Sequence, residues 1–246
     1  MKFLRFAVLF LAVVFVLPAL SAIGWWFLQD RPSGWRSADW SSSGLLPAAS
    51  ADQDAAVYVL AARTGGLKGA LAVHSWIVVK KHGATSYDRY DKVGWGAPVR
   101  KNSRSADGRW YSNEPFTVSA IHGADAERII PRVEAAIESY PFSHNGDYRV
   151  WPGSNSNSFI AHVMRIAPEL GDLPPNATGR DFWPGGISAG WSRATGDIHA
   201  TLYGLAGFTA GLTSGIELHF MGLVAGIDVK RGAIKIPAWG RIDLFG

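Results

Sequence analysis

The chain contains no cysteine among its 246 residues. Disulfide bridges, thiolate metal ligands and a cysteine nucleophile are therefore excluded. The absence of cysteine leaves the redox compartment undecided. A covalent reaction in this chain would have to use another nucleophile.

An excess of positive charge is also missing. The formal net charge is +4, and Lys2 and Arg5 at the N-terminus carry two of these charges, so the remainder of the chain has a net charge of +2. Basic runs are no longer than short pairs such as Lys80-Lys81 and Arg100-Lys101. Nucleic-acid-binding domains usually carry a marked basic surface, so we expect no nucleic-acid partner.

Several motifs for metals and cofactors are absent from the sequence. Neither a His-x-x-x-His pair nor a carboxylate cluster with metal-ligand spacing is present, which argues against a zinc site. A Gly-x-Gly-x-x-Gly turn and a phosphate loop are missing too, so we expect no nucleotide cofactor.

One long apolar run extends from Phe6 to Phe27. A helix of about 20 apolar residues is long enough to cross a bilayer. Lys2 and Arg5 precede the run, and positive charges favour the cytoplasmic side of a membrane. The sequence therefore predicts an N-terminus in the cytoplasm and a body outside it.

A cleaved signal peptide is the alternative to a permanent anchor, with a possible cleavage region at residues 18–22. The apolar run continues beyond this region from Ile23 to Leu28. Trp25 and Trp26 are suited to a membrane interface. We therefore predict a transmembrane helix that is retained over residues 1–28.

The body is expected to be rich in sheet, because 11 tryptophans and 28 glycines suggest large aromatic packing units and many tight turns. Residues 29–53 are interpreted as a linker, and residues 54–246 as a single α+β domain whose C-terminal part is glycine-rich and β. We predict an antiparallel sheet packed with two helices. The expected strands are Val57–Ala62, Ala70–Lys80, Tyr87–Trp95, one or two within Trp110–Ile121, Ile198–Tyr203, Leu205–Leu212, Ile216–Val224 and Ala233–Ile236. The expected helices are Asp125–Tyr140 and one that begins after residue 153 and ends near Leu170.

The apolar stretch 202–229 resembles a second membrane span in composition. Glu217, His219 and repeated glycines favour β-hairpins instead.

The stretch from Tyr148 to Arg165 contains the main candidate site. It is predicted to be a strand end, a turn at Pro152-Gly153 and then a helix, because the polar residues 154–158 are typical of helix N-termini. Free N–H groups at a helix start can hold a developing anion next to a hydroxyl nucleophile such as Ser156. The alternative is a polar helix cap without chemistry.

His74 is the candidate base, because it lies within an apolar strand that is expected to be central. Arg89 and Asp91 alternate on the strand predicted to pair with it, and Asp91 could accept the imidazole N–H. Trp76 and Trp151 flank His74 and the helix start, so both are expected to be buried near a cleft. The alternatives are a buried structural histidine and surface hairpin charges.

Asn155-Ser156-Asn157-Ser158-Phe159 resembles the Asn-Cys-Asn-x-Phe element of permuted papain-like folds, the PPPDE and NlpC-type groups, with serine in place of cysteine. Those folds place a strand histidine before the nucleophile helix, as His74 precedes Ser156 here. The resemblance implies that Ser156 attacks, His74 takes its proton and N–H groups near Asn157 hold the oxyanion. Serine needs a stronger base than cysteine does.

A second resemblance extends over nearly the whole chain. Its residues are Asp30–Ser42, His74–Val78, Tyr90–Gly96, Trp151–Asn157 and Asp172–Pro175, and together they resemble the bacterial domain-of-unknown-function family 3750. The resemblance implies an envelope protein anchored in the inner membrane with a periplasmic body, and it implies no reaction.

Two functions therefore remain open. The first is a hydrolase or acyl-transfer site formed by Ser156, His74 and Asp91. The second is a non-catalytic domain that binds a lipid, peptide or glycan or docks an envelope partner. Retention of His74 favours an enzyme, and the serine in place of cysteine favours a binding domain. The expected ligand-binding residues are Asn155, Asn157, Trp76, Trp151, Tyr90 and Arg89.

Overall fold

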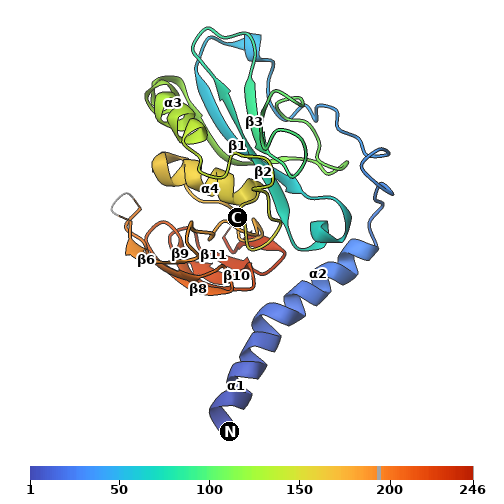
Figure 1. The fold of residues 1–246 in the computed structure, drawn as a ribbon, viewed down its shortest axis with the longest axis vertical. Coiled ribbons are helices and arrows are strands. Elements are labelled where there is room, and N and C mark those ends of the chain that lie inside the picture. Colours follow the sequence, from blue (N-terminus) through green and yellow to red (C-terminus); the bar gives the residue numbers. More distant parts are fainter. Residues whose placement is uncertain (193–194, 246) are drawn as a thin grey trace.

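A computed structural model describes residues 1–192 and 195–245 of the chain. The body contains two antiparallel sheets and two helices, and a long N-terminal helix leaves it on one side (Figure 1). This architecture confirms the predicted α+β class. The prediction of one sheet was incomplete, because the glycine-rich C-terminal strands form a second sheet of their own.

The first sheet has five strands in the order β4-β3-β2-β1-β5. Their bounds are Ala56–Arg63 for β1, Val73–Lys80 for β2, Asp88–Lys92 for β3, Val99–Lys101 for β4 and Phe116–His122 for β5. The strand β2 begins later than predicted, because Gly66–Ala70 forms a turn of 3₁₀-helix. β4 was not predicted, since most of it lies in a segment interpreted as a polar loop.

Both faces of this sheet are covered, which explains why β1 and β2 are apolar on both sides. One face packs against α3 (Gly123–Glu138) and α4 (Ser156–Ile166). The other face packs against Trp40, Leu46 and Trp110. Part of the predicted linker therefore lies on the sheet.

The second sheet is a seven-stranded meander in the order β12-β11-β10-β9-β8-β7-β6. Its strands are Ile187–Trp191, Ile198–Leu202, Ala206–Gly211, Gly215–Phe220, Leu223–Asp228, Ala233–Ile236 and Gly240–Asp243, from β6 to β12. Residues 202–229 thus form hairpins, as the polar Glu217 and His219 indicated. β6 and β12 were not predicted.

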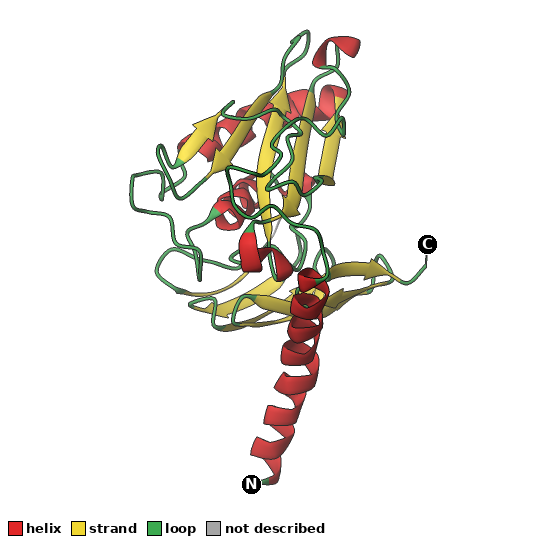
Figure 2. Cartoon of the chain, turned by 90° about the vertical axis from the view of Figure 1, so that its right-hand side faces the viewer, coloured by secondary structure: helices red, strands yellow, loops and turns green. Residues whose placement is uncertain are grey.

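The N-terminal helix is continuous through α1 (Lys2–Leu11), a π-helical turn η1 (Ala12–Val16) and α2 (Leu17–Phe27). Within the described residues it is the one helix long and apolar enough to cross a membrane. Figure 2 shows it running past the second sheet and away from the body. Three of its side chains, Phe15, Ala22 and Trp26, are nevertheless buried against the body.

Candidate functional site

Helix α4 begins at Ser156, where the polar run predicted a helix start. Asn155 is its N-cap, and its side-chain oxygen accepts the N–H of Ser158 at 3.0 Å. The Ser158 hydroxyl accepts the N–H of Asn155 at 2.7 Å, which completes a capping box. The aromatic strand end predicted before the turn was wrong, because residues 148–151 form no strand.

Asn157 fixes the start of α4 against β2. Its side-chain oxygen accepts the hydroxyl of Ser75 at 2.8 Å, and its amide nitrogen donates to the carbonyl of Val73 at 2.9 Å. Ser75 and Val73 are the two neighbours of His74 along β2. These bonds therefore place the N-terminus of α4, including Ser156, directly beside the His74 segment.

His74 meets Asp91 from the neighbouring strand. β2 and β3 pair up to Ile77 opposite Tyr90, so Asp91 lies one residue beyond the paired stretch. The distance from His74 Nε2 to Asp91 Oδ1 is 3.0 Å. Arg89 holds the same carboxylate with two bonds, from Nε at 2.7 Å and from Nη2 at 2.8 Å.

These groups are buried, and their surroundings set their charges. Burial alone would raise the pKa of Asp91, but the charge of Arg89 and the bonds from His74 and Arg89 hold that pKa well below its usual range. Burial lowers the pKa of His74, against the bond to Asp91. An ionised carboxylate can only accept, so the proton lies on Nε2 and the lone pair on Nδ1. In the described residues Nδ1 makes no hydrogen bond.

A cavity of about 250 Å³ opens beside His74. The indole of Trp110 stacks on the imidazole, with ring centroids 3.6 Å apart and planes 9° from parallel. Lys68 and Lys92 bring positive charge to the wall. Lys92 is buried, which lowers its pKa. The cavity therefore combines a neutral histidine, an aromatic wall and amine donors.

Ser156 is connected to this cavity through Tyr148, which lines it. Burial raises the pKa of Tyr148, and hydrogen bonds with the side chain and the backbone of Ser156 oppose that rise. In the part of the chain that the structure describes, no hydrogen bond joins Ser156 to His74. Tyr148 is therefore the residue that joins the start of α4 to the cavity.

The other predicted binding residues have different places. Asn155 and Asn157 bond mainly to the backbone and position α4. Trp76 is fully buried, as expected, but its N–H donates to the carbonyl of Ala106 at 2.8 Å and it does not line the cavity. Tyr90 packs on the helix-covered face of the sheet, opposite to Asp91.

The expectation that Trp151 is buried was wrong, because 38% of it is exposed. The chain turns after Tyr148, so Tyr148 enters the cavity and Trp151 points to the second sheet. A side chain added at Gly222 would lie 3.0 Å from its indole nitrogen. Trp151 therefore packs against the turn that joins β9 and β10.

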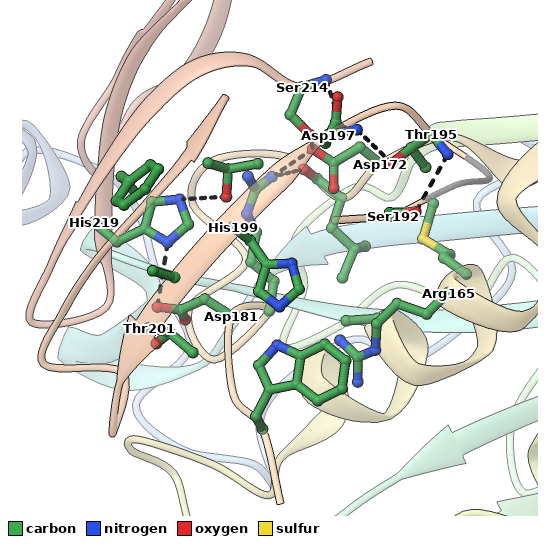
Figure 3. Close-up of a pocket in the computed structure, with 18 of the residues that line it drawn as sticks. Arg165, Asp172, Asp181, Ser192, Thr195, Asp197, His199, Thr201, Ser214 and His219 are labelled. Atoms are coloured by element: carbon green, nitrogen blue, oxygen red, sulfur yellow. Dashed lines mark hydrogen bonds and ion pairs between the residues drawn. The ribbon is translucent and has the colours of Figure 1, made fainter. Parts of the chain in front are cut away.

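A larger cavity, about 360 Å³, lies between α4 and the second sheet (Figure 3). His219 and Asp181 point to one another there, 3.5 Å apart, and Asp197 accepts the hydroxyl of Ser214 at 2.8 Å. Asp172 and Asp197 are held by internal hydrogen bonds, whereas Asp181 Oδ2 and His219 Nδ1 are buried without a hydrogen-bond partner. Because it contains no pair of base and hydroxyl at a helix start, we place the candidate reaction in the smaller cavity.

Sequence reasoning missed Lys92, Tyr148 and Trp110 as site residues. Lys92 follows Asp91 and points to the other face of β3, where it lies over the ring of Tyr148 at 5.9 Å. The strand β3 is Asp-Arg-Tyr-Asp-Lys, so a further charged residue did not stand out in the sequence. Trp110 comes from a loop, and no pattern in the sequence places it over His74.

The fold and the site define a class: an α+β protein with an apolar N-terminal helix and a buried histidine–carboxylate pair beside a cavity. A family model described as "Protein of unknown function (DUF3750)" matches residues 54–182, just over half of the chain, and the chain belongs to this family. The match contains His74, Asp91 and Ser156, and the second sheet lies outside it. No curated protein and no solved structure matches the chain, so the papain-like resemblance is not confirmed.

Proposed function

We propose that this protein is a membrane-anchored hydrolase or acyl transferase of the bacterial envelope, with its body in the periplasm. Ser156 is the nucleophile, His74 the base and Asp91 the residue that orients His74. The observation that carries the proposal is the 3.0 Å bond between His74 and Asp91 beside a cavity that Tyr148, from the segment before α4, also lines. A base oriented by a carboxylate near a helix-start hydroxyl is the arrangement that acyl transfer requires.

In the proposed reaction the substrate carbonyl displaces the Tyr148 hydroxyl from the backbone N–H groups of Ser156 and Asn157. The Ser156 oxygen then forms a bond to the carbonyl carbon, and its proton passes to His74 Nδ1. The bond to the leaving group breaks, and that group takes the proton from His74. Water, or a second acceptor, then attacks the acyl-serine while His74 takes its proton; the ester bond to Ser156 breaks, and the Ser156 oxygen takes that proton back from His74.

The cavity wall favours a substrate that carries a negative group next to an apolar or ring-shaped part. Lys68 and Lys92 provide the positive charge, and Trp95, Trp110 and Tyr111 provide the aromatic surface. Acylated peptides, glycans and lipids of the envelope have such features.

Non-catalytic binding is the second candidate, and Tyr148 favours it. It bonds to Ser156, and serine is a weaker acid than the thiol that the related motif carries. In this case the same cavity binds a ligand without reaction.

Substitution Ser156→Cys tests the pair of residues directly, because it introduces the only thiol in the chain. If His74 lies within reach, the thiolate is favoured by the imidazole and by the helix start. The alkylation rate plotted against pH should then have a midpoint well below about 8.5, the value of a free cysteine. Ser86→Cys on the exposed hairpin turn is the control and should show an ordinary midpoint.

Adding His74→Ala to Ser156→Cys should return the midpoint to that of the control. A thiol at 156 that titrates like the one at 86, or that is indifferent to His74, would mean that the catalytic pair does not exist. The binding function should then replace the enzymatic one.

A further inference from the structure

The second sheet has one polar and one apolar face, and the apolar face is the open one. In β9, Ile216 and Leu218 are 59% and 42% exposed, whereas Glu217 between them is fully buried. In β10, Ile227 is 55% exposed and the next residue, Asp228, is 1% exposed. The face turned to the body thus holds charged groups, and the face turned away holds aliphatic ones.

The strand register joins these aliphatic residues into one surface. Ile227 lies opposite Ile216 on one side and Ile234 on the other. Leu202 of β7 extends the surface, with 48% of it exposed. An antiparallel sheet with one face in water normally has its polar side outward. A continuous apolar face of this kind indicates contact with a protein or a membrane.

The N-terminal helix identifies which of these contacts the face makes. The ring of Phe15 packs against Phe220 at the end of β9, with centroids 5.5 Å apart. Phe220 belongs to the outer face, because it follows Ile216 and Leu218 at intervals of two. Figure 2 shows the sheet lying across the direction of the helix, which runs on past it.

The length of the helix fixes the depth of the sheet. Arg5 precedes Phe15 by ten residues, or about 15 Å along a helix at 1.5 Å per residue. The hydrocarbon core of a bilayer is about 30 Å thick. With Arg5 at the cytoplasmic boundary, apolar lipid therefore extends beyond the level of Phe15 toward the body, and tilt of the helix increases this excess.

We propose that the outer face of the β6–β12 sheet is seated among the acyl chains of the leaflet from which the body emerges. The inference rests on the anchoring part of the proposed function and is independent of its chemistry. β9 lies at the centre of the strand order and β6 and β12 lie at its edges, so the centre of the sheet enters the lipid deepest. The edges, whose outer backbone groups pair with no strand in the described part of the chain, lie nearest the headgroups. The candidate cavity beside His74 would then be held at a fixed height above the membrane.

Nitroxide labels test this placement, and the lack of native cysteine makes each label specific. The full chain carrying Leu218→Cys or Ile227→Cys is labelled and placed in vesicles of phosphatidylcholine and phosphatidylglycerol. Phe116→Cys is the matched control, because Phe116 is an apolar strand residue of the other sheet with the same 42% exposure as Leu218. Power saturation then compares access of oxygen, which is concentrated in lipid, with access of a water-soluble nickel chelate.

We expect labels at 218 and 227 to be several-fold more accessible to oxygen than to nickel, and the label at 116 to show the reverse. Nickel access at 218 and 227 equal to that at 116 would overturn the proposal. Spin–spin broadening that grows with the protein-to-lipid ratio would overturn it as well, because a second copy would then cover the face. Intact mass of the reconstituted protein establishes that residues 1–28 are present, so loss of the anchor is distinguished from failure of the sheet to insert.

Discussion

Asp91 keeps its negative charge in a place that water hardly reaches, because two partners share the carboxylate. Arg89 is itself fully buried and also donates to the carbonyl of Ser105 at 2.7 Å, with its guanidinium 4.1 Å above the ring of Trp76. Such a pair is costly to break, since the remaining charge is left buried without its partner. The same arrangement leaves His74 neutral and fixed in one tautomer.

Substitution Asp91→Asn should therefore destabilise the protein strongly. Removing one partner of a buried pair costs roughly 3–5 kcal/mol, and each kcal/mol lowers Tm by about 2–4 °C in a protein of this size. Asp88→Asn in the same strand is the control. Asp88 pairs with Lys101 at the surface at 3.0 Å, and an exposed pair contributes about 0–1 kcal/mol. Thermal unfolding followed by tryptophan fluorescence measures both.

The difference in stability between wild type and Asp91→Asn should depend on pH in a defined way. The pKa of Asp91 is lower in the folded protein than the value of about 3.9 for an unfolded aspartate, so the folded state binds fewer protons. Its contribution is complete above that unfolded value and is lost as pH falls toward the folded pKa. The difference in Tm between wild type and Asp91→Asn should be constant near neutrality and shrink below about pH 4. A difference that grows on acidification would contradict this assignment.

For single residues, the sequence was informative where the alternation of side chains along a strand decides which face of the sheet a residue lies on. Arg89 and Asp91 were predicted to share a face of one strand, and both turn to the side of His74. Trp151 and Tyr148 were not predictable in the same way. Which of them enters the cavity depends on the path of an irregular segment, and hydrophobicity assigns both to the interior.

Among the elements, the second sheet reverses the usual distribution of polar and apolar residues. Glu217 in β9 receives hydrogen bonds from Arg180 and Lys235 and lies 3.1 Å from His219. The charges of Arg180, Lys235 and His219 and the bond from His219 keep the pKa of Glu217 well below its usual range, against burial. This network, rather than an apolar core, holds the inner face of the sheet to the body.

Substitution Glu217→Gln should accordingly loosen the sheet. The amide keeps the shape but leaves buried cations without a counter-charge, so we expect a loss of roughly 3–5 kcal/mol. Asp243→Asn in β12 is the matched control, because Asp243 is exposed and pairs with Arg241 at 3.2 Å. Hydrogen exchange should show faster exchange in β9 to β11 for Glu217→Gln alone. Equal protection in both variants would mean that the network contributes little.

The elements themselves were largely predictable, and their association was not. Apolar periodicity located α3 and the start of α4, and the glycine-rich hairpins were separated from a membrane span by Glu217 and His219. The strands β4, β6 and β12 have three to five residues, too few for a pattern to stand out. That the C-terminal strands form a separate sheet depends on contacts across the chain.

For the whole molecule, the N-terminal helix is part of the packed structure as well as an apolar span. Trp26 donates to the carbonyl of Gly66 at 2.9 Å, and Trp239 donates to Ser21 at 3.0 Å. Together with Phe15 on Phe220, these contacts extend from residue 15 to residue 26, which is about 16 Å along the helix. The helix thus contacts the body at three points along its length. A signal peptide that is cleaved off would not need such contacts.

We therefore expect residues 1–28 to remain on the mature protein. Cleavage in the region 18–22 would remove Phe15, and the ring of Phe220 would lose its partner. Intact-mass measurement on protein extracted from membranes should give the full chain, and a mature start near Ile23 would contradict retention. A reporter fused after Gly246 should be active only outside the cytoplasm, because Lys2 and Arg5 favour the cytoplasmic side for the N-terminus. Activity of that reporter inside the cell would reverse the orientation and place the candidate cavity in the cytoplasm.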